Sequence, residues 1–264
     1  MDLQLRGKRA VVTGSTAGIG FAIARRLAGE GAIVTINGRT QASVDAGLAR
    51  LRDAVPGFDG TGVAADLSDA AGCEQVATRL AQVDILVNNL GIFEPKPFEQ
   101  IADDDWQRLF DINVMSGVRL ARALLPGMKA RNWGRVIFVS SESGICPPAE
   151  MVHYGMTKSA QLSVARGLAE TCAGTGVTVN SVLPGPTLTE GARSFFDTLA
   201  ARSGRTFDEA ARDFFAHARP TSILRRFVDP DEVGATTAYL CSPLAAATTG
   251  AAVRVDGGVV RSLV

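Results

Sequence analysis

Tyr154 and Lys158 are two side chains whose types and spacing suit acid–base chemistry. They lie four positions apart at the start of a predicted helix, so both side chains rise on the same face. A free tyrosine has a pKa of about 10 and is a poor base at neutral pH, but a nearby ammonium group favours the phenolate. Such a pair is common on amphipathic helices, so its meaning depends on the residues that accompany it.

Ser141 precedes Tyr154 by thirteen residues and opens the sequence Ser141-Glu142-Ser143-Gly144. We expect Ser141 at the carboxyl end of a strand, the edge where open α/β sheets bind their ligands. Its hydroxyl could hydrogen-bond a substrate oxygen while that oxygen gains or loses charge. Ser140 is the competing assignment, because successive strand residues alternate direction and only one of the two can face the crevice.

Two titratable neighbours, Glu142 and His153, receive no catalytic role from the sequence. His153 directly precedes Tyr154, and adjacent helical side chains point about 100° apart, so His153 cannot share the Tyr154 face. We expect His153 at the rim of the site or in a subunit contact. Glu142 could border the pocket, but nothing in the sequence requires it.

A glycine-rich turn, TGSTAGIG at 13–20, follows the first predicted strand and precedes the first predicted helix. In such a turn one glycine permits the sharp bend, a second lets the backbone approach a pyrophosphate, and a third lets the helix pack close to the strand. The unpaired N–H groups at the helix start then point at the anion. This order predicts nucleotide binding, with contacts from Gly14, Ser15, Thr16, Gly18, Ile19 and Gly20.

Predicted strands and helices alternate along the chain. The first unit is a strand at 8–13, a helix at 18–30 and a strand at 32–37, and further strand segments are 62–66, 84–89, 135–140, 177–182 and 252–257. Strands that alternate with helices must be parallel, with right-handed crossovers. The pattern predicts an α/β fold, a three-layer, Rossmann-type, doubly wound parallel sheet of about seven strands in the order 3-2-1-4-5-6-7. One domain spanning 1–264 is the expected organisation.

The span 188–227 interrupts this alternation. It contains six of the twelve phenylalanines, which is more aromatic than a solvated loop should be. We predict two short helices here that cover an apolar, substrate-binding pocket.

Charge and cysteine usage narrow the class of protein. Lys plus Arg and Asp plus Glu are 27 each, so there is no electrostatic footprint for nucleic acid or an anionic membrane surface. No segment reaches the roughly 18 apolar residues that span a bilayer, and the first residues do not have the pattern of a signal peptide. The four cysteines lack metal-binding or redox spacing. We therefore expect a cytoplasmic protein with a small-molecule ligand, no metal, no nucleic acid partner and no membrane.

Four motifs together resemble the classical short-chain dehydrogenase/reductase (SDR) family: TGSTAGIG, NNLG at 88–91, Ser141 followed by Tyr154-x-x-x-Lys158, and PGPTLT at 184–189. The resemblance covers essentially the whole chain. It implies a Rossmann-type fold, a nicotinamide dinucleotide and a homotetramer, for which the apolar faces of the helix at 117–128 and of the Tyr154 helix would pack across a two-fold axis.

The resemblance also implies a catalytic set of Asn113, Ser141, Tyr154 and Lys158. In this set Asn113 would hold a water beside the lysine and extend a proton relay to solvent. The alternative for Asn113 is that it only fixes a kink in a helix.

Asp66, followed by Leu67, is implied to accept a hydrogen bond from the adenine amino group of the cofactor. The other role open to Asp66 is to cap the next helix, which Ser68 could do instead.

Asn89 and Gly91 are implied to lie against the ribose and adenine, and Leu90 replaces the alanine that the family usually has between them. Leu90 adds bulk beside the fourth strand. The remaining implied cofactor contacts are Pro184, Gly185, Thr187 and Thr189 around the nicotinamide amide, together with Tyr154 and Lys158.

The end of the second strand should decide between NAD(H) and NADP(H). NAD-specific members of the family usually carry an acidic residue there, and this sequence has Gly38 at that position, followed by Arg39. Arg39 could meet a 2′-phosphate with a forked donor, or it could be a solvated arginine at a strand end. Ala17 lacks the extra basic side chain that some NADP-dependent relatives have at that position. We expect NADP(H) to be preferred, with NAD(H) as the alternative.

The combined prediction is an NADP(H)-dependent oxidoreductase that moves a hydride between nicotinamide and a carbonyl or secondary alcohol. A non-catalytic dinucleotide-binding sensor or scaffold on the same fold is the alternative, and its mark would be a broken catalytic set.

The substrate stays open between a 3-oxoacyl group on an acyl carrier protein, a sugar or polyol, and a bulkier cyclic alcohol. The phenylalanines argue against a highly hydroxylated sugar, because apolar walls leave hydroxyls unpaired. An acyl carrier would need a basic rim, which Arg193, Arg202, Arg205 and Arg212 could form, unless they only solvate helix faces.

Overall fold

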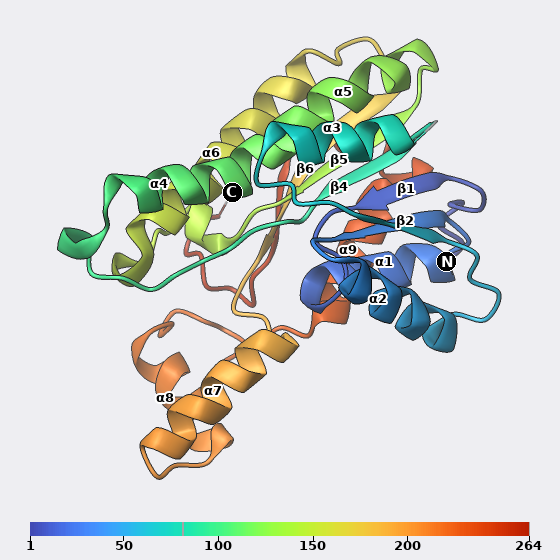
Figure 1. Ribbon diagram of the computed structural model, residues 1–264. Coiled ribbons are helices and arrows are strands. Elements are labelled where there is room, and N and C mark those ends of the chain that lie inside the picture. The colour runs from blue at the N-terminus through green and yellow to red at the C-terminus, as the bar shows by residue number, and fades with distance from the viewer. Residues whose placement is uncertain (81, 264) are drawn as a thin grey trace.

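A parallel β-sheet forms the centre of the protein in a computed structural model that describes residues 1–80 and 82–263 (Figure 1). The strands of this sheet are β1 (Arg9–Val12), β2 (Ile33–Gly38), β3 (Thr61–Ala64), β4 (Ile85–Asn88), β5 (Gly134–Val139), β6 (Val177–Pro184) and β7 (Ala252–Val255). They lie in the order β3-β2-β1-β4-β5-β6-β7, and each neighbouring pair is parallel. The predicted fold class and strand order are therefore confirmed.

Helices cover both faces of the sheet (Figure 1). One layer contains α1 (Gly18–Gly29), α2 (Gln41–Ala54) and α9 (Pro230–Cys241), and the other contains α3 (Ala70–Arg79), α5 (Ser116–Ala130) and α6 (Val152–Glu170). Each layer has its own apolar core against one face of the sheet, which is why β4 and β5 are buried along their whole length. Within the described residues, none of the helices is both long enough and apolar enough to span a membrane.

The sheet reverses its winding direction between β1 and β4, which are neighbours in the sheet. Ligands of open α/β sheets bind outside the carboxyl ends of the strands at such a point. The turn at 13–20 follows β1, Asn89 follows β4, and Ser141 follows β5. The topology therefore brings the predicted site residues to one edge of the sheet.

The 188–227 segment forms a helical hairpin of α7 (Glu190–Arg202) and α8 (Phe207–His217), which projects from the rest of the molecule (Figure 1). Both ends of the hairpin are held together, because Leu188 N donates to Val228 O at 2.9 Å and Val228 N donates to Pro186 O at 2.8 Å. The two short helices expected in this segment are confirmed.

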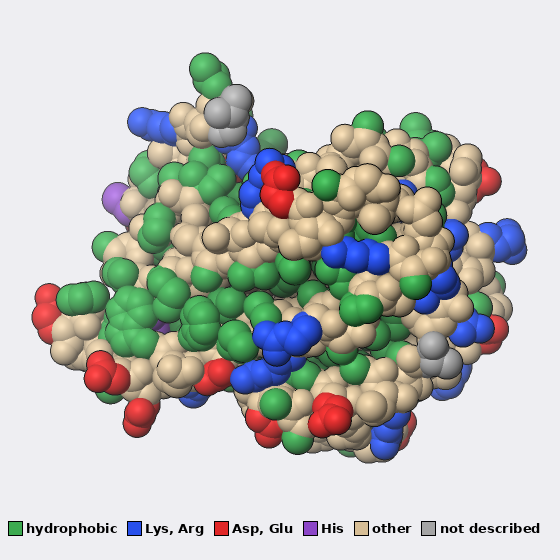
Figure 2. Space-filling view, turned by 90° about the horizontal axis from the view of Figure 1, so that it is seen from above, with side chains coloured by type: hydrophobic (Ala, Val, Ile, Leu, Met, Phe, Trp, Pro, Cys, Tyr) green, Lys and Arg blue, Asp and Glu red, His purple; other side chains and the backbone are tan. Residues whose placement is uncertain are grey.

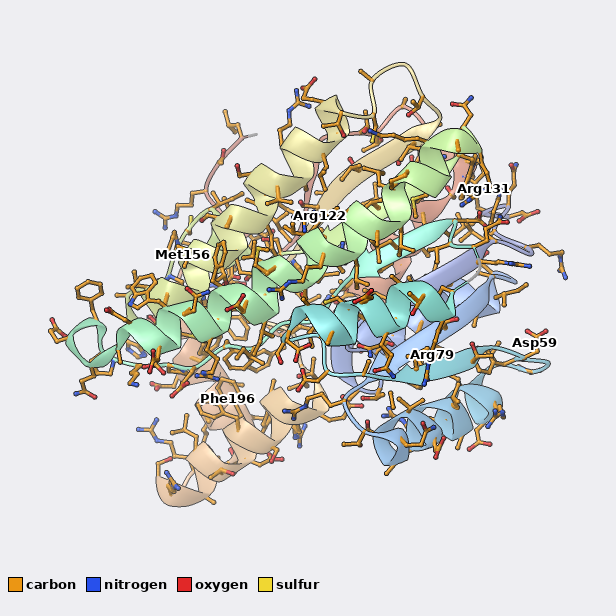
Figure 3. All side chains as sticks on the ribbon, turned by 45° about the horizontal axis from the view of Figure 1, so that its top comes forward. Asp59, Arg79, Arg122, Arg131, Met156 and Phe196 are labelled. Carbon is orange, nitrogen blue, oxygen red and sulfur yellow. The ribbon has the colours of Figure 1, made fainter. Side chains whose placement is uncertain are left out.

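The phenylalanines of this hairpin pack against one another. Phe196, on α7, is buried, and its ring centre lies 4.9 Å from that of Phe227 and 5.3 Å from that of Phe214 (Figure 3). These rings therefore pack mainly against one another, and the apolar pocket that the hairpin is expected to cover stays a prediction. The hairpin projects away from the sheet, so its aromatic side chains form a small core of their own.

Candidate active site

Tyr154 and Lys158 both lie in the first half of α6, with the Lys158 Nζ 5.5 Å from the centre of the Tyr154 ring. Lys158 is buried, and its Nζ donates to Val139 O at 3.0 Å and to Gln161 Oε1 at 3.1 Å. The ring of Phe93 meets Tyr154 edge-on at a centroid distance of 6.1 Å. The predicted pair is therefore brought together, with the amine held by the end of β5 and by its own helix.

The pKa values of these two groups move in opposite directions. Burial lowers the pKa of Lys158 to about 7. Burial raises the pKa of Tyr154, and the negative charge of Glu142 raises it further. The expected lowering of the Tyr154 pKa by a Lys158 ammonium does not hold here, because burial disfavours the charge on both groups. The chain by itself therefore favours the protonated phenol.

Ser140 and Ser141 point in different directions, as strand alternation requires. The Ser140 hydroxyl donates to Lys158 O at 2.8 Å and fixes α6 against the end of β5. The Ser141 hydroxyl contacts Glu142 and also forms a hydrogen bond with Tyr154. Of the two serines, Ser141 is thus the one that lies with Tyr154.

Asn113 lies in a π-helical turn, Asp111–Met115, that joins α4 (Asp103–Phe110) to α5. Its side chain donates to Ile92 O at 2.9 Å and accepts from Ile92 N at 2.8 Å. The backbone carbonyl of Asn113 accepts from Gln161 Nε2 at 2.7 Å. Since Gln161 also accepts from Lys158, a glutamine links Asn113 to the lysine, and the expected water relay stays a prediction.

Three residues without a predicted role lie at the catalytic set: Glu142 and Gln161 contact it directly, and Arg219 pairs with Glu142. Glu142 is buried and accepts hydrogen bonds from its neighbouring serines and, at 3.1 Å, from Arg219 Nε. Gln161 follows Lys158 by three positions on the same helix face, so helical spacing could have pointed to it. Arg219 had no sequence signal, because it lies in the segment after α8, far along the chain.

His153 is fully buried, so the expectation of a rim or subunit-contact position is wrong. Its ring packs edge-on to Trp106 of α4 with centroids 5.9 Å apart, and burial lowers its pKa. The reason is that α4 packs against the start of α6 and covers His153 with Trp106.

The glycine-rich turn has the shape that the sequence predicted. Gly14 and Gly18 both adopt φ +57°, a conformation that side chains disfavour. A Cβ on Gly20 would lie 2.4 Å from Asn89 Nδ2 and 2.5 Å from Gly14 O. The Asn89 amide donates to Thr13 O at 2.9 Å and to Gly14 O at 3.0 Å, so Asn89 ties the end of β4 to this turn.

Ser15, Thr16 and Ile19 complete the glycine-rich turn. Ser15 is buried, and its hydroxyl donates to Val12 O at 2.6 Å and accepts from Asn37 N at 3.0 Å. The Ser15 side chain therefore holds β1 to β2, and its backbone N–H also donates within the protein, to Asn37 O at 2.9 Å. Thr16 and Ile19 are half-buried beside it.

The start of α1 presents an N–H group to a carboxylate. Gly18 N donates to Glu190 Oε2 at 2.9 Å, and Arg50 Nη2 donates to Glu190 Oε1 at 2.9 Å. Burial raises the pKa of Glu190, but backbone hydrogen bonds and Arg50 outweigh this and hold it below its usual range. The carboxylate occupies the place where a helix N-terminus binds anions, so the turn fits the pyrophosphate of a dinucleotide.

On the predicted adenine side, Asp66 is exposed and accepts from Ser68 N at 3.0 Å. Leu67 is buried in the apolar core, so its side chain cannot reach a ligand. The cap of α3 is Asp69, whose carboxylate accepts from Gly72 N at 2.8 Å. The capping roles considered for Asp66 and Ser68 are therefore wrong, because the helix begins later than either would need.

Gly38, at the end of β2, is closely packed against neighbouring side chains. A Cβ on Gly38 would lie 2.7 Å from Thr16 Cγ2 and 2.8 Å from Ser43 Oγ. Arg39 follows it and is exposed. The strand end thus offers a cation and no carboxylate, as the sequence predicted.

Gly91 borders the catalytic residues, since a Cβ there would lie 3.3 Å from Lys158 Nζ and 3.5 Å from Asn113 Oδ1. Leu90 lies over the glycine turn, where its Cδ1 would be 3.2 Å from a Cβ on Gly14. The larger side chain of Leu90 is accommodated by packing against the apolar core.

The residues that follow β6 make a bend towards the glycine turn. Gly185 lies against the backbone of Asp256, because a Cβ there would be 2.6 Å from Asp256 O. Thr187 Oγ1 donates to Gly185 O at 2.9 Å. Thr189 caps α7 by accepting from Ala192 N at 3.2 Å, and its methyl group faces Gly18. The nicotinamide contacts expected of Pro184, Gly185, Thr187 and Thr189 stay predictions.

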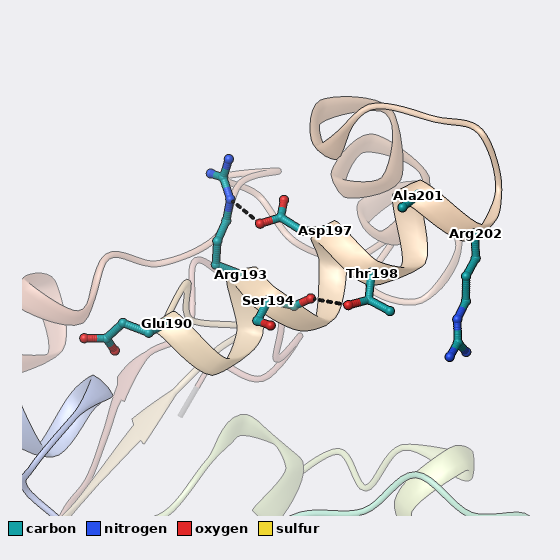
Figure 4. A pocket seen from close by; sticks show the side chains of 7 residues that line it. All are labelled: Glu190, Arg193, Ser194, Asp197, Thr198, Ala201 and Arg202. Atoms are coloured by element: carbon teal, nitrogen blue, oxygen red, sulfur yellow. Dashed lines mark hydrogen bonds and ion pairs between the residues drawn. The ribbon is translucent and has the colours of Figure 1, made fainter. Parts of the chain in front are cut away.

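One face of α7 borders a cavity of about 680 Å³ (Figure 4). Its lining residues are Glu190, Arg193, Ser194, Asp197, Thr198, Ala201 and Arg202. Arg193 pairs with Asp197 at 3.3 Å within this face. All seven residues lie on α7, and four of them, Glu190, Arg193, Asp197 and Arg202, have charged side chains.

Comparison with known proteins agrees with this geometry. Residues 8–200 match the family model described as short chain dehydrogenase. The chain is 48% identical over 263 residues to the uncharacterized oxidoreductase YvaG of Bacillus subtilis, covering 100% of both. It is 37% identical over 259 residues to the D-beta-hydroxybutyrate dehydrogenase of Cupriavidus necator, covering 96% of this chain and 98% of that one. The solved structure of L-sorbose reductase from Gluconobacter frateurii, complexed with NADPH and L-sorbose, superposes with a TM-score of 0.94 at 31% identity, covering 100% of both chains.

Proposed function

Because this chain belongs to the short-chain dehydrogenase family and is an oxidoreductase, we propose that it transfers a hydride between NADP(H) and a carbonyl or secondary alcohol, with Tyr154 as the acid–base group. The observation that supports this most is the meeting of Tyr154 with the Ser141 hydroxyl, beside the buried amine of Lys158. These groups lie at the carboxyl edge of the sheet, next to a turn shaped for a dinucleotide.

Each residue of the set has a role in this proposal. The nicotinamide, when bound, supplies or accepts the hydride. Tyr154 donates its phenolic proton to the substrate oxygen in reduction and takes it back in oxidation. Ser141 hydrogen-bonds the same oxygen. Lys158 binds the cofactor ribose, and Asn113 orients Lys158 through Gln161.

The direct test is the loss of NADPH absorbance when the purified chain is mixed with single carbonyl compounds. We would include a 3-oxoacyl thioester, a cyclic ketone and L-sorbose, because L-sorbose is bound by the similar structure. Turnover of the thioester would indicate a 3-oxoacyl reductase activity, and turnover of L-sorbose would indicate a hydroxylated substrate. A chain that oxidises NADPH with none of these carbonyl classes would contradict the proposal.

We further propose that residues 1–264 form one oxidoreductase domain in which the α7–α8 hairpin covers the substrate. The hairpin is attached beside the glycine turn, where Thr189 faces Gly18. Its two ends are joined by the hydrogen bond from Leu188 N to Val228 O, which fixes where the cover is attached.

Arg39 should make NADPH bind about ten- to hundredfold more tightly than NADH, because a charge-assisted hydrogen bond contributes about 1.5–3 kcal/mol. Exposure of Arg39 places the expected value towards the lower end. Arg39→Ala should remove the NADPH advantage and leave NADH binding nearly unchanged, as measured by fluorescence titration with both cofactors. Arg52→Ala, an exposed change in the last turn of α2, is the control. Equal losses for both cofactors in Arg39→Ala would show that Arg39 only covers the adenine.

We also propose that the protein is a symmetric homotetramer. Hydrophobic side chains gather on the end of the molecule where α4 and the start of α6 lie (Figure 2), and Phe93 and Phe98 are exposed there. Light scattering should report a multiple of the 27.6 kDa chain mass at micromolar concentration, and a monomer would contradict the proposal. The cytoplasmic location stays a prediction.

A further inference from the structure

The carboxylate of Glu142 is buried beside Ser141 and is surrounded by hydrogen-bond donors. Its Oε2 accepts from the Ser141 hydroxyl, from Ser143 N at 2.9 Å and from the Ser143 hydroxyl at 3.1 Å. Its Oε1 accepts from Arg219 Nε at 3.1 Å, and the Glu142 side chain is only 6% exposed. Both oxygens are therefore engaged, and the carboxylate is fixed in one place against the serine proposed to bind substrate.

Arg219, which pairs with this carboxylate, belongs to the segment that follows α8. Its side chain is 12% exposed and lies over the ring of Phe214, 5.6 Å from the ring centre. It also donates to Glu150 Oε1 at 3.2 Å, but the Glu150 side chain is half exposed. Solvent weakens the Glu150 contact, so Glu142 is the strongly coupled partner of Arg219.

Both charges act on Tyr154. The groups that face this tyrosine are Lys158 from its own helix, Phe93 from the segment after β4, Ser141 and Glu142 from the end of β5, and Arg219 from beyond α8. After burial, the charge of Glu142 is the next cause that raises the pKa of Tyr154. The hydrogen bond of Ser141 and the charge of Arg219 act in the opposite direction.

We propose that Glu142 is a positioning residue for the reaction, which fixes the Ser141 hydroxyl and, opposed by Arg219, sets how firmly Tyr154 holds its proton. This inference rests on the roles proposed above for Tyr154 and Ser141. A negative charge beside a phenol favours the protonated form, and a positive charge favours the phenolate. Glu142 thus keeps Tyr154 as an acid, the form that protonates a carbonyl oxygen during reduction, and Arg219 limits this effect.

The test uses the fact that the sequence has two tyrosines, Tyr154 and Tyr239. Tyr239 is 42% exposed on α9, so Tyr239→Phe should fold normally and leaves Tyr154 as the single tyrosine. The ultraviolet difference absorbance of tyrosinate, followed against pH with NADP⁺ bound, then reports Tyr154 without any substrate. Adding Tyr154→Phe gives the tyrosine-free blank.

In this background Glu142→Gln should bring the tyrosinate signal to a lower pH, and Arg219→Gln should move it to a higher pH, each by on the order of one pH unit. Glu150→Gln is the matched control, because it removes a carboxylate that touches the same Arg219 but is half exposed. The tyrosinate signal of Glu150→Gln should appear at the same pH as that of the Tyr239→Phe background.

Opposite shifts for the two variants support the proposal. The proposal is overturned if the tyrosinate of Glu142→Gln titrates at the same pH as in the Tyr239→Phe background, or does not appear before the chain unfolds. Shifts of both variants in the same direction overturn it as well. If Arg219→Gln does not fold, Arg219→Lys keeps the charge and should keep the background titration, while Glu142→Gln still decides the outcome.

Failure of this inference can be told from failure of the proposed function. If the chain reduces carbonyls and loses turnover in Tyr154→Phe, but the titrations coincide, only the role of Glu142 is wrong. If Tyr154→Phe keeps its turnover, the proposed function itself fails, whatever the titrations show.

Discussion

Tyr154→Phe lowers carbonyl turnover by about two or more powers of ten, the usual scale for loss of a general acid–base group. The substitution removes the hydroxyl that meets Ser141 and keeps the ring that packs against Phe93. Ser141 keeps its hydrogen bond to Glu142, so no buried group loses its last partner. The variant should therefore fold and bind NADPH like the parent, and the loss should lie in kcat.

The matched control is Tyr239→Phe, which removes the same hydroxyl from an exposed position on α9. It should turn over like the parent. The measurement is the initial rate of NADPH loss with the best carbonyl compound, together with NADPH titration of both variants. Activity of Tyr154→Phe within a few-fold of the parent would exclude Tyr154 as the acid–base group.

Lys158→Met is expected to have the second-largest effect, a loss of turnover of about a hundredfold together with weaker cofactor binding. The amine is buried between Val139 O and Gln161 Oε1 and borders Gly91, so no other cation can replace it from solvent. Lys129→Met is the control, because Lys129 bonds the backbone of Thr171 at the far end of α6. A variant with parent-like turnover and parent-like affinity for NADPH would refute a role for Lys158.

The same variant makes a prediction about stability and pH. The pKa of Lys158 falls from 10.5 to about 7 on folding, because burial disfavours the ammonium form. Between these values the unfolded chain binds the extra proton, so stability rises with pH over this window. The destabilisation by Lys158 is thus complete below pH 7 and is lost as pH approaches 10.5. In thermal unfolding of the cofactor-free proteins, the Tm of Lys158→Met should rise relative to the Tm of the parent as pH falls from 10 to 7. A Tm difference that does not change with pH would contradict the lowered pKa.

The sheet could be predicted because its signals are local. Each strand is a short apolar run between turn residues, and parallel pairing with right-handed crossovers leaves few arrangements for such an alternation. The strand order β3-β2-β1-β4-β5-β6-β7 followed from that rule. The glycine turn and the helical pair of Tyr154 and Lys158 could likewise be predicted, because each motif spans eight residues or fewer.

The hairpin at 188–227 shows what local reasoning leaves open. Its phenylalanine content correctly indicated packed helices, but composition does not say which surface the rings bury. Phe196 and Phe227 packed within the hairpin, and the side of α7 that borders a cavity is polar. The predicted position of His153 was wrong, because helical spacing gives the direction of a side chain and not the element that packs against it.

The sequence by itself determined the fold class, the glycine turn and the identity of the groups at the site, because these depend on residue types and short spacings. The tertiary structure decided the protonation of those groups, since burial and distant charges set their pKa values. Glu142 and Arg219 are 77 positions apart, and Asn113 and Gln161 are 48 apart. Contacts over such separations depend on how whole helices and loops pack, so no local pattern could have shown that a carboxylate, rather than an ammonium, exerts the strongest charge on Tyr154.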